Sequence, residues 1–494
     1  MGKSKVTSGN FPQSRSGQPG SSPILSGRLR ASKALTTFGV WSILLLFSSC
    51  AGFHGKPPIH ASPSEQKALH PIEPADITSI PQNAEACLHP ETADRPLISP
   101  AAAMRWHAAF RKKHFAPWHR EEPTTSREMA FRGIERFLSE PIFGENKLPR
   151  SKEWIDAFRR STAMESYPNT KRKAIAVTNS SLRLLPTFEP VFYDFDLPGE
   201  GYPFDHLQVS AVWGGTPLFL AHTAADGSWV LAETPFAAGW MPIEDIAFVD
   251  EAFMRAYETE RLAALIQDRV PLTGTDSGFR FMGRLGTVLP LEAEDEDTLH
   301  VLLPVSDTNR RAVLIRAKGS RENAGVMPVP ATPRNIAALI NQLLGRPYGW
   351  GGLYGNRDCS ATLKDLFTPF SIWLPRNSPR QAAAGLFIPL HNLDLPDKER
   401  LIREKGIPFL SLLWMPGHIM LYLGESRGSP LVFHNTWGIK TKSPQGKEGR
   451  HIIGRAVITT LQPGIELPDI LLPQGNLLYR IEGMTLLIPA ENAG

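Results

Sequence analysis

The stretch YGWGGLYGNRDCSA, residues 348–361, decides how the chain is interpreted, because a glycine-rich run leads directly into a cysteine. Asp358 has a side chain that caps helix N-termini well, so we expect a helix to begin at Cys359. One face of that helix would carry Cys359, Leu363, Leu366 and Phe370. A thiol in the first turn feels the positive end of the helix dipole and free N–H groups, which favour the thiolate. The position fits a reactive nucleophile, and equally a small buried hydrophobe.

Two histidines downstream favour the nucleophile. The segments WMPGHIMLYLG (414–424) and PLVFHNTWG (430–438) alternate like strands and are joined by ESRGS, which indicates a hairpin. With a turn centred near Arg427, Met420 would face His434, so that His418 and His434 lie on one face as diagonal neighbours. We expect this face to pack over the cysteine helix. A thiol and two imidazoles would then supply a nucleophile, a base and a residue that orients the base.

The N-terminus has the pattern of an export signal. A basic region precedes the apolar run FGVWSILLLF (38–47), and small residues follow it. The run is too short to span a membrane, which takes roughly 20 apolar residues. Cys50 after two serines resembles a bacterial lipoprotein cleavage box, and ordinary cleavage after Ala51 is the alternative. We expect an exported, periplasmic protein that is lipidated at Cys50.

Composition restricts the remaining functions. The formal net charge of +4 over 494 residues gives no case for nucleic-acid binding. Three cysteines without a CxxC spacing exclude a disulfide scaffold and indicate no metal site, and we expect no cofactor. Cys87 has no evident partner and is interpreted as an ordinary free thiol.

The chain divides into successive segments. Residues 101–167 have helical periodicity and are interpreted as packing elements, with Pro117 ending the first helix. Short alternating strands then predict two small barrels, and Asp226–Gly227 marks a hairpin turn in the first. The predicted boundaries are 1–51 for a disordered start and export signal, 52–100 for a Pro/Ala-rich linker, 101–167 for the helical segment, 168–250 and 251–328 for the barrels, and 329–490 for an α+β domain.

Several motifs together resemble one family. YGWGG, RDCSA, LPRNSPRQA, GHIMLYLG and HNTWG look like the NlpC-type cell-wall cysteine peptidases. FAPWH (115–119) and FDHLQVSAVWGGTP (204–217) are similar to the subgroup with an N-terminal helical segment and two bacterial SH3-like barrels. The resemblance covers the chain from about residue 100 to its end.

This resemblance implies a fold and an activity. It implies a papain-like α+β catalytic domain that cleaves the γ-D-glutamyl–diamino acid bond of peptidoglycan stem peptides (murein tri- and tetrapeptides). Cys359 would be the nucleophile, His418 the general base and His434 the residue that orients the base. The substrate-binding residues that it implies are Asp358 and Ser360 at the amino end of the substrate, Tyr348 and Trp350 along the cleft, and Arg376 and Ser378 from the PRNS motif.

Phe236 departs from the family pattern. Relatives often place an aromatic hydroxyl before the GW of the first barrel, whereas TPFAAGW offers a phenyl ring, which can stack but cannot donate a hydrogen bond. Asp358, placed to receive an ammonium group, predicts a preference for stems with a free N-terminal L-alanine.

Two other functions remain open from the sequence. The fold could serve a non-catalytic wall-binding protein, or the same cysteine and histidine could perform amidase or acyltransferase chemistry.

Overall fold

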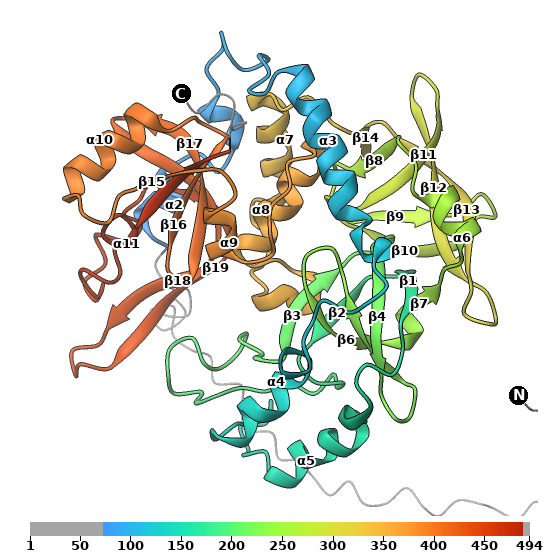
Figure 1. Cartoon of the computed structure of the whole chain (residues 1–494). Helices are drawn as coiled ribbons and strands as arrows, with labels where there is room; N and C mark the ends of the chain where they lie inside the picture. Colours follow the sequence, from blue (N-terminus) through green and yellow to red (C-terminus); the bar gives the residue numbers. More distant parts are fainter. Residues whose placement is uncertain (1–72, 488–494) are drawn as a thin grey trace, which may run out of the picture. The chain divides into compact units, whose positions relative to one another are not determined.

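The computed structural model describes residues 73–487, so the predicted export signal and Cys50 lie outside the described residues. N-terminal helices are followed by two sets of β-strands and then by a mixed helix and strand domain (Figure 1). This order confirms the predicted architecture of a helical segment, two barrels and an α+β domain. No helix between residues 73 and 487 is both long enough and apolar enough to cross a membrane.

Residues 73–99, which we call the strap, lie against the C-terminal domain. Asp76 accepts hydrogen bonds from the backbone N–H and the hydroxyl of Thr460, both at 2.7 Å. Gln82 exchanges two hydrogen bonds of 2.9 Å with the backbone of Ile458. The prediction of a loose linker is therefore wrong for this part of the chain, because its polar side chains satisfy backbone groups of the domain. The strap contains α2 (Ala75–Ser79) and a 3-10 turn (Ala84–Cys87).

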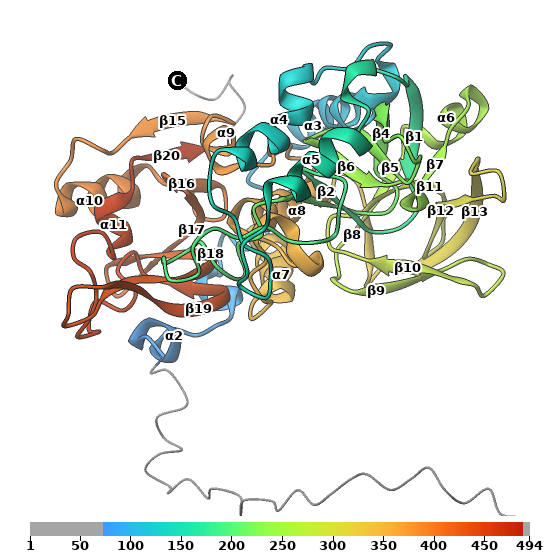
Figure 2. The ribbon, with the colours of Figure 1, turned by 90° about the horizontal axis from the view of Figure 1, so that it is seen from below.

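The N-terminal helices pack on the barrels. Helix α3 ends at His114, just before FAPWH, in which Phe115 and Trp118 are buried among residues of both barrels. The indole Nε1 of Trp118 donates to the carbonyl of Ala174 at 2.8 Å. Two further helices, α4 and α5, cover the first barrel (Figure 2). The bounds are α3 (Pro100–His114), α4 (Arg127–Leu138) and α5 (Lys152–Ser161).

The first barrel is a seven-stranded antiparallel sheet in the order β3-β2-β6-β5-β4-β1-β7. Strands β4 and β5 form the predicted hairpin, and Gly227 in its turn has a φ of +73°. The strands are β1 (Arg172–Ala176), β2 (Ser180–Arg183), β3 (Gln208–Val212), β4 (Pro217–Thr223), β5 (Trp229–Glu233), β6 (Ala238–Pro242) and β7 (Ile246–Phe248).

The second barrel combines a five-stranded sheet, in the order β13-β12-β11-β8-β14, with the hairpin β9–β10. Its own apolar cluster, which includes Leu272, Phe281 and Leu299, fills the space between them. The elements are α6 (Glu251–Tyr257), β8 (Leu262–Leu265), β9 (Val270–Thr273), β10 (Phe279–Gly283), β11 (Val288–Glu294), β12 (Thr298–Ser306), β13 (Ala312–Ser320) and β14 (Ala324–Val326).

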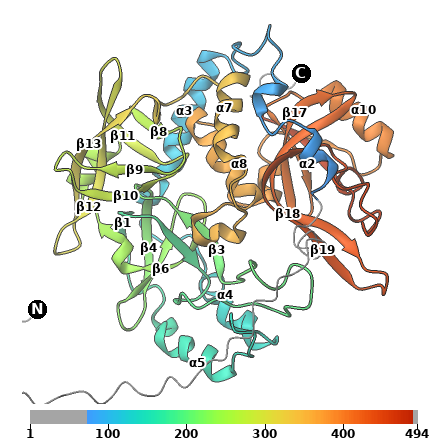
Figure 3. The ribbon, with the colours of Figure 1, turned by 180° about the vertical axis from the view of Figure 1, so that it is seen from behind.

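The C-terminal domain is built on a six-stranded antiparallel sheet in the order β15-β20-β16-β17-β18-β19. Helices α7 and α8 pack on one face of this sheet and lie between it and the barrels (Figures 1 and 3). The helices are α7 (Pro333–Leu343), α8 (Cys359–Phe367), α9 (Ser378–Ala382), α10 (Leu395–Lys405) and α11 (Leu477–Arg480). The strands are β15 (Leu386–Pro389), β16 (Ser411–Met415), β17 (His418–Ser426), β18 (Ser429–Lys442), β19 (Glu448–Thr459) and β20 (Gly483–Leu486).

Candidate active site

A glycine-rich loop brings the start of α8 against the first barrel. Gly351 and Gly352 have positive φ values of 58° and 91°. A Cβ atom on Gly352 would collide with the backbone nitrogen of Ala211, and one on Gly351 would stand 2.5 Å from the carbonyl oxygen of Gln208. Only glycine combines this backbone conformation with so close an approach to β3. The glycine run therefore places the first turn of α8 beside the first barrel.

Cys359 is the first residue of α8, as the sequence predicts. Asp358 caps the helix, with Oδ1 accepting from the N–H of Ala361 at 2.8 Å. The thiol is buried, and 7% of the residue is exposed. The backbone N–H groups of Ile419 and Ser360 lie near its sulfur and oppose the rise of its pKa. The sulfur therefore lies at the junction of α8 with the beginning of β17.

The thiol does not have the depressed pKa that the helix position suggests. Burial, and then the neighbouring Asp358 carboxylate, raise the pKa of Cys359 to about 12 against the opposing N–H group of Ile419 and the Arg376 guanidinium. The expectation that the helix position favours the thiolate is not met, because desolvation outweighs the helix dipole. A neutral thiol requires a base that removes its proton as it attacks.

The two histidines are hydrogen-bonded to each other. Leu421 of β17 pairs with Phe433 of β18. This pairing agrees with the predicted register, in which the preceding residue, Met420, faces His434. His418 Nε2 lies 2.8 Å from His434 Nδ1, and the ring centroids are 5.1 Å apart. The prediction that both side chains share one face of the hairpin is confirmed.

Both imidazoles are neutral near pH 7. Burial, and to a smaller extent Arg480, lower the pKa of His418 to about 3. Burial, and then His418, lower the pKa of His434 well below its usual value. Each ring therefore carries one N–H and one lone pair, as a base and its orienting partner require.

The face of the sheet that packs on α8 is not the histidine face. Ile419 and Leu421 of β17 share an apolar cluster with Leu363 of α8, whereas Met420 belongs to the cluster on the other side of the sheet. The prediction that the histidine face packs over the cysteine helix is therefore wrong. The thiol instead reaches the strand at its first residues, through the N–H of Ile419, the residue next to His418.

Asp358 is ion-paired with Arg376. Nη1 of Arg376 donates to Oδ1 of Asp358 at 3.1 Å, and Nη2 donates to Oδ2 at 2.7 Å. Burial alone would raise the pKa of Asp358, but Arg376 and the N–H of Ala361 hold it below its usual value. Nε of Arg376 also donates to the hydroxyl of Ser210 in β3 at 2.8 Å, which joins the pair to the first barrel. If the ammonium group of a ligand bound at Asp358, it would therefore share the carboxylate with the guanidinium of Arg376.

A cleft of about 760 Å³ opens beside the thiol, between the C-terminal domain, the first barrel and α4. Gly417, which precedes His418, lies on its wall. The predicted residues that line the cleft are Phe236, Tyr348, Trp350, Asp358, Cys359, Ser360, Arg376 and Ser378.

Sequence reasoning missed the part of the cleft that the helical segment builds. Met129 and Arg132 of α4 line it, so the interpretation of residues 101–167 as packing elements alone is wrong. Glu233 of β5 also lines the cleft. Its carboxylate accepts hydrogen bonds from Arg120 and from the backbone N–H of Thr124 and that of Thr125, at 2.7–3.1 Å. The signal that could have drawn attention to Glu233 is a carboxylate in an otherwise apolar strand, three residues before Phe236.

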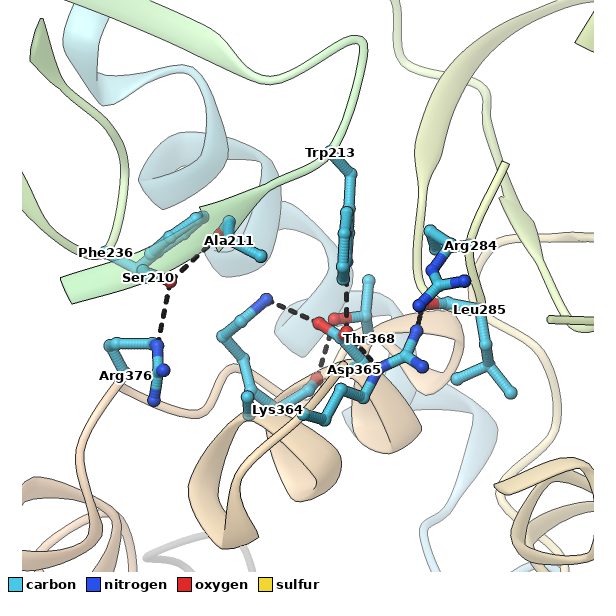
Figure 4. Close-up of polar contacts among 12 residues, drawn as sticks. Ser210, Ala211, Trp213, Phe236, Arg284, Leu285, Lys364, Asp365, Thr368 and Arg376 are labelled. Carbon is cyan, nitrogen blue, oxygen red and sulfur yellow. Dashed lines mark hydrogen bonds and ion pairs between the residues drawn. The ribbon is translucent and has the colours of Figure 1, made fainter. Parts of the chain in front are cut away.

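A buried charge network joins helix α8 to the barrels (Figure 4). The carboxylate of Asp365 accepts from the Trp213 indole at 3.0 Å, from Nε of Arg357 at 2.6 Å and from Lys364 at 2.7 Å. Nη2 of Arg357 donates to Asp268 of the second barrel at 3.0 Å. The first barrel therefore bonds directly to α8, and the second bonds to Arg357, which in turn donates to Asp365 of α8.

The described residues include no evident metal site. Across residues 73–487, no cluster of three or more His, Cys, Asp and Glu side chains has the arrangement of a metal site. Cys87 is free and half-buried, and burial raises the pKa of its thiol.

Comparisons with known families match four segments of the chain. The N-terminal stabilising domain of NlpC/P60 proteins matches residues 39–167, and the NlpC/P60 family itself matches residues 345–448. Between them, an SH3 domain of the SH3b1 type matches residues 190–242 and one of the SH3b2 type matches residues 250–296. No curated protein sequence matches the chain significantly.

Among solved structures, an NlpC/P60 endopeptidase from Photobacterium damselae subsp. piscicida is 28% identical, with a TM-score of 0.75. The match covers 85% of this chain and 98% of that one. An NlpC/P60 family protein from Bacillus cereus ATCC 10987 is 16% identical over 64% of this chain and 100% of its own, with a TM-score of 0.43. The four matched segments and the nearly complete coverage of the Photobacterium enzyme show that the chain belongs to the NlpC/P60 family, with a helical stabilising domain and two SH3 domains before the catalytic domain.

Proposed function

We propose that this protein is a cysteine endopeptidase that cleaves peptidoglycan stem peptides between γ-D-glutamate and the diamino acid. The observation that carries the proposal is a buried thiol at a helix start next to a strand that begins with one of two hydrogen-bonded histidines. In this proposal Cys359 is the nucleophile, His418 is the general base and His434 orients the base.

The reaction follows from these groups. His418 takes the proton of the Cys359 thiol while the sulfur attacks the carbonyl carbon of the scissile amide. The imidazolium then gives the proton to the departing amine, which leaves a thioester on the sulfur. Water, deprotonated by the same imidazole, hydrolyses the thioester and restores the thiol. Because the resting thiol is neutral, catalysis depends on His418 in its neutral form.

The charge of the cleft supports an anionic peptide substrate. Arg120 is paired with Glu233, and Arg376 is paired with Asp358. Arg132 and Arg380 also line the cleft, and neither forms an ion pair with any residue between 73 and 487. Two uncompensated guanidinium groups favour carboxylates, which stem peptides carry at the D-glutamyl and diamino acid residues.

We further propose that stems with a free L-alanine amine are preferred. Asp358 and Ser360 line the cleft beside the nucleophile, where the amino end of a stem would lie if its γ-glutamyl carbonyl reached the sulfur. The first barrel and α4 form the wall at this end, which leaves less room for a glycan attached to the alanine. Because Arg376 already neutralises Asp358, we expect steric exclusion to contribute more than charge.

The location that we propose is the periplasm, after export, with an acyl anchor at Cys50. A single acyl chain binds a membrane only marginally, so firm attachment needs the several chains of a lipoprotein cysteine. Cell fractionation of wild type and Cys50→Ser tests this proposal. Loss of membrane association in the variant is the expected result, and a wild-type protein found entirely in the soluble fraction contradicts it.

Mass spectrometry of a defined substrate tests the activity. Purified protein incubated with L-Ala-γ-D-Glu-diaminopimelate should yield L-Ala-γ-D-Glu and free diaminopimelate. Cys359→Ala should lower the rate by about a thousandfold or more while the melting temperature stays unchanged. Cys87→Ala is the matched control, because it removes the other free thiol of the described chain. Binding without cleavage would favour a wall-binding protein, and different products would favour an amidase or acyltransferase.

A further inference from the structure

The hydrogen bonds beyond His434 determine which of its nitrogens carries the proton. The hydroxyl of Thr459, at the end of β19, lies 3.1 Å from His434 Nε2. The same hydroxyl donates its proton to the carbonyl of Thr460 at 2.7 Å. A hydroxyl has one proton, so towards His434 it can only accept. Nε2 of His434 is therefore the protonated nitrogen.

The assignment continues to His418. With its proton on Nε2, neutral His434 offers a lone pair at Nδ1. Nε2 of His418, which lies 2.8 Å away, must then be the donor. His418 consequently keeps its free lone pair on Nδ1, the only ring nitrogen left to take a proton from a thiol.

We propose that Thr459 is a positioning residue that sets the tautomer of His434 and, through it, keeps Nδ1 of His418 available as the base. The effect on the tautomers rests on the geometry alone. The effect on the rate rests on the function proposed above.

The strap secures the acceptor at the end of this chain of hydrogen bonds. Asp76 receives both the backbone N–H and the hydroxyl proton of Thr460 at 2.7 Å. The carbonyl of Thr460, which receives the proton of Thr459, therefore belongs to a residue fixed from a distant part of the sequence. Burial of Thr459 excludes water that could otherwise replace either contact.

Valine at position 459 would remove the acceptor without changing the shape of the side chain. Nε2–H of His434 would then face a methyl group, and the opposite tautomer of His434 would remove this unpaired buried donor from its ring. In that arrangement Nδ1 of His434 donates to His418, and His418 must carry its proton on Nδ1. The base would be blocked although all three predicted catalytic residues remain in place.

Histidine side-chain nitrogen spectra test the tautomers directly. In protein labelled with ¹⁵N-histidine at pH 7.5, the His418 and His434 signals, assigned with His418→Gln and His434→Gln, should both show protonation on Nε2. Thr459→Val should move both rings partly or fully to Nδ1 protonation, and Thr459→Ser should restore the wild-type pattern. Protonation of wild-type His434 on Nδ1 would overturn the proposal, whether or not the protein proves to be a peptidase.

Kinetics provide the second measurement. We expect Thr459→Val to lower kcat by about ten- to a hundredfold with KM unchanged, and Thr459→Ser to recover most of the loss. Thr485→Val is the matched control: Thr485 is a fully buried threonine of β20 whose hydroxyl donates to the carbonyl of Ala382 at 2.6 Å, away from the histidines. Equal kcat losses in the two valine variants, or a wild-type kcat in Thr459→Val, would overturn the proposal. Should Thr459→Val fail to fold, the wild-type spectrum still decides.

Discussion

The two barrels meet the catalytic domain in different ways. In the first barrel, Gln208, Glu233 and Phe236 line the cleft, and the indole of Trp213 forms a hydrogen bond with Asp365 of α8. The second barrel meets the domain at buried charges, where Asp268 pairs with Arg357. Among the residues described, those that line the cleft include none between 251 and 328. One barrel therefore shapes the cleft, whereas the other supports the helix that carries Cys359.

Among substitutions at the contacts between barrels and catalytic domain, Arg376→Met should have the largest effect, because Arg376 links the first barrel to the cleft. The substitution leaves Asp358 buried without a counter-charge, and we expect a loss of about 3–5 kcal/mol in the free energy of unfolding. kcat/KM should also fall, by at least about a hundredfold, because Arg376 and Asp358 both line the cleft beside the thiol. Denaturant unfolding and steady-state kinetics measure both, with Ser210→Ala as the milder control that removes only the barrel contact. A variant as stable as wild type would show that the pair does not hold the barrel and the cleft together.

Asp268→Asn tests the supporting role of the second barrel. Arg357 keeps Asp365 but loses its second carboxylate, so we expect about 1–3 kcal/mol less stability. KM should stay unchanged, because Asp268 does not line the cleft. A rise in KM similar to that of first-barrel variants would break the distinction between the two barrels.

Lowering the pH should reduce the stability that the same network of buried charges provides. Burial opposes ionisation of Asp268, but Arg357 and Arg284 hold its pKa below the usual value. A carboxyl group whose folded pKa is depressed stabilises the protein above its unfolded pKa of about 3.9, and this contribution is lost as pH falls towards the folded pKa. Melting temperatures between pH 6 and pH 3 should therefore fall less steeply in Asp268→Asn than in wild type. Parallel curves would mean that Asp268 contributes nothing to acid sensitivity.

Phe236→Ala should affect binding more than stability. The ring lines the cleft, and the ammonium group of Lys364 lies 4.6 Å from its centre. We expect KM to rise about tenfold, which corresponds to the loss of one aromatic contact of about 1.4 kcal/mol. Phe279→Ala is the control from the second barrel, where the ring is 58% exposed, and it should leave KM unchanged. Equal effects of the two alanine variants would contradict the division of roles.

The smallest effect concerns the amino end of the substrate. An unpaired carboxylate would favour a free amine by ten- to a hundredfold, but Asp358 already pairs with Arg376. We therefore expect kcat/KM for L-Ala-γ-D-Glu-diaminopimelate to exceed that for its N-acetylated form by less than about tenfold. Asp358→Asn tests whether the remaining preference depends on charge, with folding checked by circular dichroism. A preference above a hundredfold would mean that Arg376 moves away when substrate binds.

The sequence predicted local features well. The cap at Asp358, the helix from Cys359 and the shared face of His418 and His434 follow from capping chemistry and strand alternation. These rules act over a few residues, or over one hairpin, and therefore need no knowledge of the tertiary structure.

Features that depend on distant parts of the chain could not be predicted in this way. Arg376 reaches Ser210 across 166 residues, and Asp76 reaches Thr460 across 384. The raised pKa of Cys359 likewise depends on what covers the thiol, which helix position alone does not reveal. Local rules predicted an activated thiolate because they include the dipole of α8 and omit the desolvation imposed by its surroundings.

The buried network that joins Asp365 and Arg357 to the two barrels has a consequence for the exchange of domains between proteins. Asp365 and Arg357 pair with each other, and each also has a partner in a barrel: Trp213 of the first donates to Asp365, and Asp268 of the second accepts from Arg357. A catalytic domain grafted onto foreign barrels would keep the pair between Arg357 and Asp365 but lose both barrel partners, which leaves buried polar groups incompletely satisfied. Shuffling of such modules therefore requires compensating changes on both sides of each contact. Barrels and catalytic domain are in this sense inherited as one unit, although each has the fold of a separate module.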